Sequence, residues 1–124
     1  RSSATIQRSF ELFEKHGYRP VLGVSKPHEH PMWAMKLHGE YLIPFIEANG
    51  LNLRSQDLPA AYVVNGSIYL ITPEDLRNNR SFHSTKTVPV FVDSQIEALD
   101  IDTEFDWRCA VAHLADKSTE SQLP

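Results

Sequence analysis

A β-strand is predicted by the run Tyr62-Val63-Val64-Asn65-Gly66-Ser67-Ile68-Tyr69-Leu70-Ile71, because β-branched and aromatic residues dominate it. Strand alternation places Asn65, Ser67 and Tyr69 together on one face. That polar face is either an exposed surface or the wall of a cleft. We favour the cleft wall, because buried polar groups need partners and a ligand can supply them. Gly66 inside the strand indicates that another backbone or a ligand approaches closely.

The second informative stretch is acidic and reads Asp100-Ile101-Asp102-Thr103-Glu104-Phe105-Asp106. If its start is extended, the side chains of Asp100 and Asp102 point to the same face, roughly 6.6 Å apart. Two such carboxylates repel unless a cation lies near them or one stays protonated, and Mg²⁺ is commonly held by one or two carboxylates plus substrate phosphates. The alternative is a helix start, because Thr103 is followed three residues later by Asp106. Spacing alone favours this cap over a metal site.

Length and composition describe a soluble globular protein. The 124 residues suit one small domain or part of a larger one, and 41% are apolar and 23% charged. The net charge of −4 argues against general nucleic-acid binding. A single cysteine excludes an intramolecular disulfide and fits the reducing cytoplasm. No apolar run approaches the roughly 18 residues of a membrane span, so we expect neither nucleic acid nor membrane as a partner.

The other predicted elements alternate between helices and strands. In the first half of the chain we predict a helix from Ser2 to His16 that Gly17 ends, a buried strand Val21–Ser25 and a β-hairpin at about 32–46. A second helix follows, capped by Thr72 with Pro73 in its first turn, and it ends near Asn78-Asn79. The remaining elements are a strand Val88–Val92, which Pro89 places at a sheet edge, a helix from about Glu104 to Ala115 and a polar tail Lys117–Pro124. This order indicates an α/β fold, with too few elements for a complete doubly wound nucleotide-binding domain.

The hairpin is predicted from alternation on both sides of a turn. Trp33, Met35 and Leu37 alternate with other residues and share one face. His38-Gly39 supplies the turn, and Tyr41–Phe45 returns. A hairpin this apolar needs another surface to cover it, which is either the core of the domain or a second subunit.

Two further clusters carry possible chemistry. The trio His28, Glu29 and His30 suggests zinc, but no third well-spaced ligand is nearby, so we interpret these as solvated loop residues. Cys109 and His113 are four residues apart on a predicted helix and could form a nucleophilic pair. A small thiol on an apolar face is the preferred interpretation.

In this order, the Tyr62–Tyr69 and Asp100–Asp106 motifs resemble the acylneuraminate cytidylyltransferases, the family of the CMP-sialic acid synthetases and their legionaminic and pseudaminic acid relatives. The resemblance runs from about Ser2 to Leu114. It implies a Rossmann-like mixed sheet of the nucleotide-diphospho-sugar-transferase type, of which this chain would be the C-terminal portion. The hairpin would then be a protruding dimerisation arm.

The resemblance also implies an activity and a homodimer. Members transfer CMP from CTP to the anomeric hydroxyl of a nine-carbon 2-keto sugar acid, a nonulosonic acid, and release pyrophosphate with Mg²⁺. By resemblance, Asp100 and Asp102 match the aspartates that hold the metal at the catalytic centre. The implied substrate-binding residues are Asn65 and Tyr69 on the sugar-binding wall, Arg54 and Gln56 near the acyl-sugar pocket, and Phe82, an aromatic that reaches into the partner subunit's pocket.

The sequence departs from the family in two ways. Trp33 and Val63 stand where the sialic acid enzymes often have a lysine and an arginine, which shifts the expected substrate towards a relative such as legionaminic acid. The glycine-rich basic loop that grips the triphosphate is also absent, since the five glycines are not clustered. We therefore expect the C-terminal half of an enzyme, inactive alone. The alternative is a non-catalytic dimerising or sugar-acid-binding module without a nucleotide site.

Overall fold

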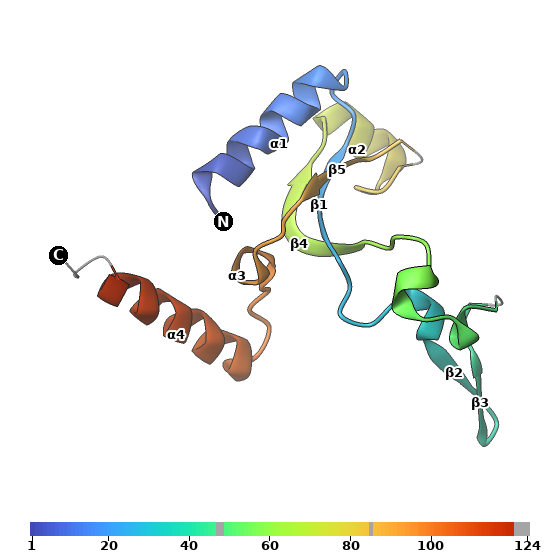
Figure 1. Ribbon diagram of the computed structural model, residues 1–124. Coiled ribbons are helices and arrows are strands. Elements are labelled where there is room, and N and C mark those ends of the chain that lie inside the picture. Colours follow the sequence, from blue (N-terminus) through green and yellow to red (C-terminus); the bar gives the residue numbers. More distant parts are fainter. Residues whose placement is uncertain (47–48, 85, 121–124) are drawn as a thin grey trace. The chain divides into compact units, whose positions relative to one another are not determined.

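The computed structural model describes residues 1–46, 49–84 and 86–120 (Figure 1). The chain forms two compact units, one of Arg1–Ser25 with Val64–Pro124 and one of Lys26–Val63. Both α-helices and β-strands are present, so the predicted α/β class is confirmed. Whether the chain is a single domain or part of one stays a prediction.

A three-stranded mixed sheet forms the centre of the first unit. Its strand order is β4 (Val63–Leu70), β1 (Val21–Ser25) and β5 (Val88–Phe91), and β1 and β5 run parallel. The position of β5 at an edge agrees with Pro89, which has no N–H to donate to a further strand. The core is small and consists of Val21, Leu22, Val90 and Val92.

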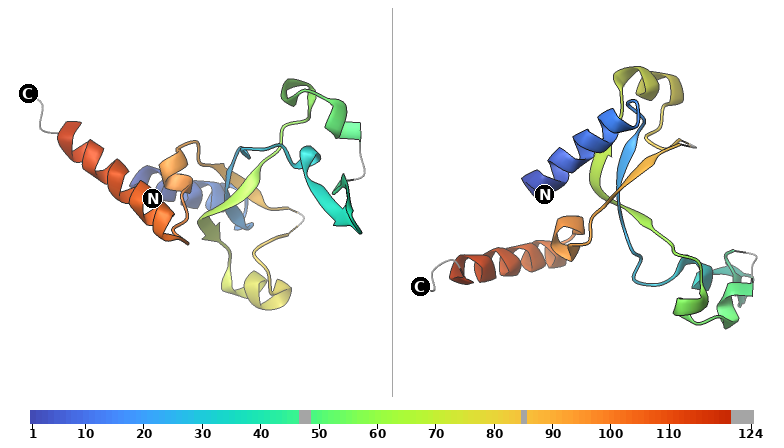
Figure 2. Two further views of the ribbon diagram at one scale, coloured as in Figure 1. Left: turned by 90° about the horizontal axis from the view of Figure 1, so that it is seen from below. Right: turned by 45° about the horizontal axis from the view of Figure 1, so that its top comes forward.

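Helix α1 (Ser3–Lys15) packs against β1 and β5 of this sheet (Figure 2). The Ser2 hydroxyl caps it by accepting a hydrogen bond from the Thr5 N–H at 3.2 Å. Gly17, with φ +67°, follows the helix and confirms the predicted stop. Ser9 is fully buried, and its hydroxyl donates to the Thr5 carbonyl at 2.7 Å, so this polar side chain is satisfied within the helix.

The predicted cap of α2 (Pro73–Asn79) is also confirmed, because the Thr72 hydroxyl accepts from the Asp75 N–H at 3.1 Å. One short helix, α3 (Gln95–Ala98), was not predicted and separates β5 from the acidic stretch. The start of the acidic stretch, considered above as an extended segment, lies between α3 and α4 and is not assigned to a strand. A Ser94 hydroxyl that accepts from the Glu97 N–H starts this single turn, and its shortness hides it from periodicity.

The last helix, α4 (Glu104–Glu120), is longer than predicted. The polar tail predicted from Lys117 is wrong as far as Glu120, and residues 121–124 lie outside the described part of the chain. The sequence between Ala115 and Glu120 contains no glycine or proline, so nothing in it ends the helix. In the part of the chain that the structure describes, no helix combines the length and apolar character needed to cross a membrane.

The second unit contains the predicted hairpin, formed by β2 (Met35–His38) and β3 (Tyr41–Pro44). Gly39, with φ +63°, lies in its two-residue turn. Trp33 was expected in the hairpin but belongs to a 3₁₀ turn, η1 (Pro31–Trp33). Pro31 begins this turn and His30 caps it, which removes Trp33 from the strand.

Two more 3₁₀ turns, η2 (Asn49–Asn52) and η3 (Ser55–Asp57), complete the second unit. Both precede the run that enters β4, and neither was predicted. Runs of three or four residues are too short for a hydrophobic period to identify them.

Candidate functional site

On the polar face of β4, the side chain of Asn65 is hydrogen-bonded to Ser67 of the same strand. The Asn65 Oδ1 accepts hydrogen bonds from the Ser67 N–H at 3.1 Å and from the Ser67 hydroxyl at 2.6 Å. This contact agrees with the predicted shared face of the two residues. The Asn65 Nδ2 is buried and has no hydrogen-bond partner among the described residues. A donor is therefore left over on this face, and a buried donor without a partner is unfavourable.

Two glycines allow close approaches at this strand. A Cβ on Gly23 of β1 would lie 2.1 Å from the Ser67 Oγ, so the Asn65–Ser67 pair sits directly over Gly23. Gly66 has φ +70°, and a Cβ on it would lie 2.8 Å from the Asp100 Oδ2. The close approach predicted at Gly66 is thus made by a carboxylate of this same chain, which is one of the two predicted metal ligands.

Tyr69 and Phe82 also come together, although one lies on β4 and the other follows α2. Their rings pack edge to face with centroids 5.1 Å apart and an interplanar angle of 63°. Both side chains remain exposed on their other sides. This pair forms an aromatic surface, and Phe82 is therefore anchored within its own subunit by Tyr69.

The acidic stretch divides into two parts. The Asp106 carboxylate accepts hydrogen bonds from the Thr103 hydroxyl at 2.6 Å and the Thr103 N–H at 2.8 Å, while the Thr103 hydroxyl accepts from the Asp106 N–H at 3.2 Å. The predicted helix cap is confirmed on these two residues. The bond from the Thr103 hydroxyl, followed by that from the Thr103 N–H, lowers the pKa of Asp106 below its ordinary value. The side chains of Asp100 and Asp102 are exposed, and neither carboxylate takes part in the hydrogen bonds between Thr103 and Asp106.

Two observations bear on whether Asp100 and Asp102 suit Mg²⁺. Carboxylate oxygens are the hard donors that this ion prefers, and Gly66 leaves space for the Asp100 carboxylate against β4. Residues 1–46, 49–84 and 86–120 contain no group of three His, Cys, Asp or Glu side chains placed to hold a metal by themselves. Asp100 and Asp102 thus offer donors of the kind that Mg²⁺ prefers, and its other ligands would have to be phosphate or water oxygens.

The histidine cluster is not a metal site. His30 Nδ1 accepts from the Met32 N–H at 3.2 Å, so the Nε2 carries the proton and donates to the Pro59 carbonyl at 2.9 Å. Both ring nitrogens are used, and no lone pair remains for zinc. His30 is half-buried and structural rather than a solvated loop residue as predicted, whereas His28 and Glu29 are exposed.

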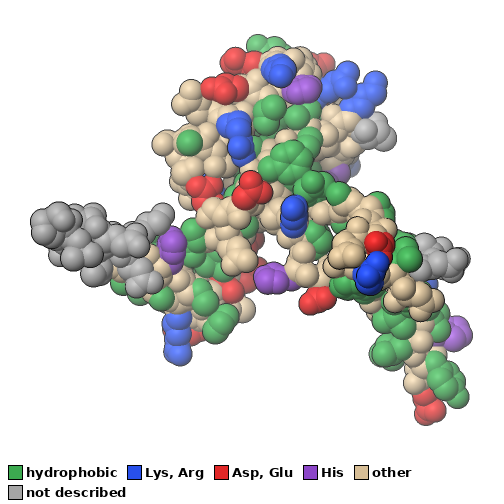
Figure 3. Space-filling view, viewed as in Figure 1, with side chains coloured by type: hydrophobic (Ala, Val, Ile, Leu, Met, Phe, Trp, Pro, Cys, Tyr) green, Lys and Arg blue, Asp and Glu red, His purple; other side chains and the backbone are tan. Residues whose placement is uncertain are grey.

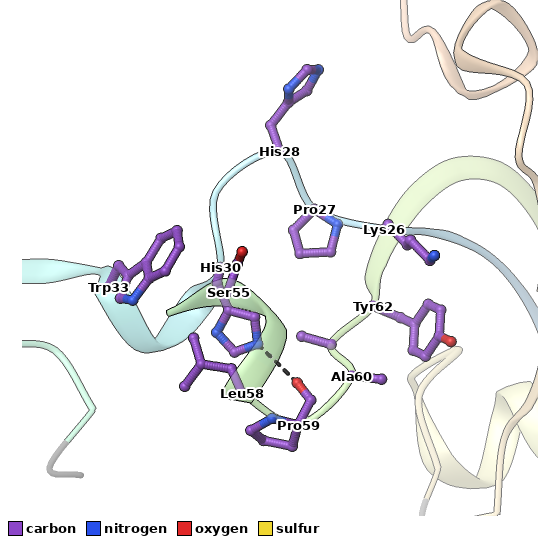
Figure 4. A pocket seen from close by; sticks show the side chains of 11 residues that line it. Lys26, Pro27, His28, His30, Trp33, Ser55, Leu58, Pro59, Ala60 and Tyr62 are labelled. Atoms are coloured by element: carbon purple, nitrogen blue, oxygen red, sulfur yellow. Dashed lines mark hydrogen bonds between the residues drawn. The ribbon is translucent and has the colours of Figure 1, made fainter. Parts of the chain in front are cut away.

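The second unit holds Arg54 and Gln56. The Arg54 Nε pairs with the Asp57 Oδ2 at 3.0 Å across η3, and both Arg54 and Gln56 are exposed. The same segment contributes to a cavity of about 260 Å³ that the sequence did not predict (Figure 4). Its lining is mainly apolar and includes Trp33, Leu58, Pro59 and Tyr62, with Lys26 at its edge. Figure 4 shows His28 pointing away from these side chains, while His30 reaches Pro59.

The cavity residues share one sequence signal that could have indicated them. Leu58-Pro59-Ala60-Ala61-Tyr62 is an uninterrupted apolar run next to polar Arg54–Asp57, outside any regular strand or helix. Such a run shows no helical or strand periodicity, so the sequence does not indicate what it contacts. Only the folded loop shows that it lines the same cavity as Trp33.

The structure therefore brings some predicted residues together. Asp100 meets Gly66 beside Asn65, and Phe82 meets Tyr69, all in the first unit. Arg54 and Gln56 belong to the second unit. In the first unit, the Asp100 carboxylate thus lies beside a strand that carries an amide and an aromatic side chain, groups that can contact a polar ligand.

Comparison with known proteins identifies relatives of this chain. No protein-family model matches the chain. It is 32% identical over 109 residues to the CMP-N,N'-diacetyllegionaminic acid synthase of Legionella pneumophila, which covers 86% of this chain and 46% of that protein. It is 29% identical over 115 residues to an N-acylneuraminate cytidylyltransferase of Streptococcus agalactiae serotype V, and 28% identical to that of serotype III, each covering 92% of this chain and 27% of the relative.

Along 86–92% of its length, this chain is homologous to the acylneuraminate cytidylyltransferases, which confirms the resemblance found in the sequence. The chain spans less than half the length of these relatives.

Proposed function

We propose that this chain is the metal- and sugar-binding half of a cytidylyltransferase that transfers CMP from CTP to a nonulosonic acid and releases pyrophosphate. The observation that carries the proposal is the contact of the Asp100 carboxylate with Gly66, next to the unpartnered amide of Asn65. Homology to a CMP-N,N'-diacetyllegionaminic acid synthase and to N-acylneuraminate cytidylyltransferases supports it. In the full-length protein, the first unit would complete a Rossmann-like sheet of the nucleotide-diphospho-sugar-transferase type.

In this proposal Asp100 and Asp102 hold Mg²⁺. The ion would neutralise the charge that develops on the α-phosphate of CTP while the sugar hydroxyl attacks. Asn65 donates its free Nδ2–H to an oxygen of the sugar acid, which gives this buried donor the partner it lacks. The exposed surface of the Tyr69–Phe82 pair holds an apolar face of the sugar. These contacts would orient the attacking oxygen, which is the proximity contribution to the rate.

By resemblance, we also propose Arg54 and Gln56 of the second unit as substrate-binding residues; both are exposed, and Arg54 pairs with Asp57. Within the same unit, the cavity lined by Trp33, Leu58 and Tyr62 offers apolar contacts to a bound group. The sequence has no glycine-rich loop for the triphosphate, so we expect the 124 residues alone not to turn over CTP.

The metal assignment is tested in the full-length protein. We expect Asp102→Asn and Asp100→Asn each to reduce Mg²⁺-dependent pyrophosphate release by orders of magnitude, because an amide does not replace the carboxylate charge at the ion. Thermal melting should be unchanged. Asp93→Asn is the matched control, since Asp93 is exposed and lies before α3, and it should keep full activity. Full activity in Asp102→Asn would overturn the assignment.

The second candidate is a sugar-acid-binding or dimerising module without catalysis, for which the exposed apolar face of the hairpin is the supporting observation. Calorimetry with a nonulosonic acid separates the two. If the chain is a binding module, the sugar binds without Mg²⁺ or CTP and the full-length protein releases no pyrophosphate under any condition. If it is part of an enzyme, the full-length protein releases pyrophosphate when CTP, Mg²⁺ and the sugar are present.

A further inference from the structure

The segment that carries Asp100 has no regular structure of its own. Residues 99–103 lie between α3 and α4, and no strand pairs with them. A catalytic carboxylate on such a segment needs restraints from elsewhere, because an irregular loop samples many conformations and loses affinity for a metal in doing so.

Arg1 supplies one restraint by joining this segment to β4. The Arg1 guanidinium donates from one N–H to the Leu99 carbonyl at 3.1 Å and from its Nε to the Ser67 carbonyl at 3.4 Å. Leu99 immediately precedes Asp100, and Ser67 immediately follows Gly66. A single planar cation therefore connects the two backbones whose close approach places Asp100 against Gly66.

The start of α1 supplies a second restraint, on α3. The Thr5 hydroxyl donates to the Glu97 carboxylate at 2.7 Å, and the Ser2 hydroxyl donates to the Thr5 Oγ1 at 3.0 Å. Hydrogen bonds from Ser2, then from Thr5, lower the pKa of Glu97, which is consistent with a carboxylate held in its charged form. Because Glu97 is two residues before Leu99, this contact fixes α3 just before the segment begins.

We propose that Arg1 and Thr5 are positioning residues that hold the Asp100 carboxylate against Gly66, so that it meets a divalent cation already oriented. The metal part of this inference rests on the proposed function. The restraint itself rests only on contacts within the first unit, between α1, α3 and β4. Partners behind metal ligands commonly matter in this way, since they set ligand orientation.

The experiment combines local amide exchange with Mg²⁺ titration in the full-length protein. Arg1→Gln removes the guanidinium that donates to both the Leu99 and the Ser67 carbonyls. We expect faster hydrogen exchange at the amides of residues 99–102, with no change at buried Val90, and a Mg²⁺ concentration for half-maximal pyrophosphate release about 10- to 100-fold higher. The rate at saturating Mg²⁺ should stay close to that of the parent. A purely structural role for Arg1 would instead lower the melting temperature without moving the Mg²⁺ requirement.

Arg8→Gln is the matched control. Arg8 lies on α1, just after Arg1 in the chain, and its guanidinium also donates to a backbone carbonyl, that of Phe91, which is not in the Asp100 segment. Both readouts should match the parent. Thr5→Val provides a second test if Arg1→Gln folds poorly, because it removes only the hydroxyl from the Glu97 contact, and Thr5→Ser should restore parental behaviour.

The outcomes separate the two proposals. Unchanged exchange at residues 99–102 in both Arg1→Gln and Thr5→Val overturns the positioning role. Faster exchange with an unchanged Mg²⁺ requirement supports the restraint and overturns the assignment of Asp100 to the metal. Faster exchange with a raised Mg²⁺ requirement supports both.

Discussion

Gly66 is the residue on which the candidate site depends most directly. Its positive φ disfavours any side chain, and its missing Cβ leaves the space in which the Asp100 carboxylate lies. Gly17 has almost the same φ but nothing within 4 Å of a Cβ. A side chain at Gly17 would therefore cost backbone strain alone. At Gly66 it would cost the same strain and also displace the Asp100 carboxylate.

Gly66→Ala should destabilise the protein more than Gly17→Ala. A non-glycine residue at such a φ costs about 1–3 kcal/mol, and at Gly66 the displacement of Asp100 adds to that cost. Urea unfolding of the two variants measures the difference. Mg²⁺-dependent activity should fall in Gly66→Ala only. Equal loss of stability in both variants, with equal activity, would show that the Asp100 contact contributes nothing.

At the scale of elements, the start of α4 shows which part of the acidic stretch forms the cap. Thr103 and Asp106 hydrogen-bond to each other across the first turn, which leaves Asp100 and Asp102 outside the helix. The cap interpretation is therefore confirmed on Thr103 and Asp106, and the metal role of Asp100 and Asp102 stays a proposal. The cap fixes where the helix begins, and hence how far the two free aspartates lie from it.

The cap makes the helicity of α4 dependent on pH. The pKa of Asp106 is lowered in the folded state, so its contribution is fully present above its unfolded pKa, near 4, and is lost as the pH falls through the lower, folded value. Below about pH 4 we expect helical chemical shifts at the first turn of α4 to weaken. Asp106→Asn should weaken them already at pH 7 and remove the pH dependence. An unchanged acid transition in that variant would assign it to another group.

At the scale of the whole molecule, the hairpin of the second unit exposes several large apolar side chains. Register places Met35 opposite Pro44 and Leu37 opposite Leu42, so one face is entirely apolar. Leu37 is 76% exposed and Leu42 63% exposed, and Figure 3 shows hydrophobic side chains gathered along this part of the chain. A two-stranded hairpin is marginally stable alone, so we propose that a second copy covers this face in a homodimer.

Leu37→Asp tests the homodimer. We expect sedimentation of the full-length protein to show a dimer, and this substitution to weaken the dimer about ten-fold or more, because it places a charge in a desolvated apolar contact. Leu76→Asp is the control, since Leu76 is an exposed leucine on α2, which belongs to the first unit and not to the hairpin. A dimer of equal strength in all three proteins would exclude the hairpin as the contact.

The sequence by itself determined the elements whose signals are local. The caps at Ser2, Thr72 and Thr103 and the stop at Gly17 each involve partners within four residues, so the pattern contains the whole interaction. Strand parity on β4 and the edge position of β5 follow in the same way from single residues such as Pro89. The resemblance to the acylneuraminate cytidylyltransferases could also be found, because the two motifs occur in order within this chain.

Only the tertiary structure decided which distant residues meet. The contacts of Arg1 with Leu99, of Asp100 with Gly66 and of Tyr69 with Phe82 join positions between 13 and 98 residues apart. The short α3 and the cavity around Trp33 have no periodic signal either. Local pattern fixes backbone conformation, because that depends on neighbours along the chain. The position of a carboxylate depends on packing between elements, and here the lack of a side chain at Gly66 decides it.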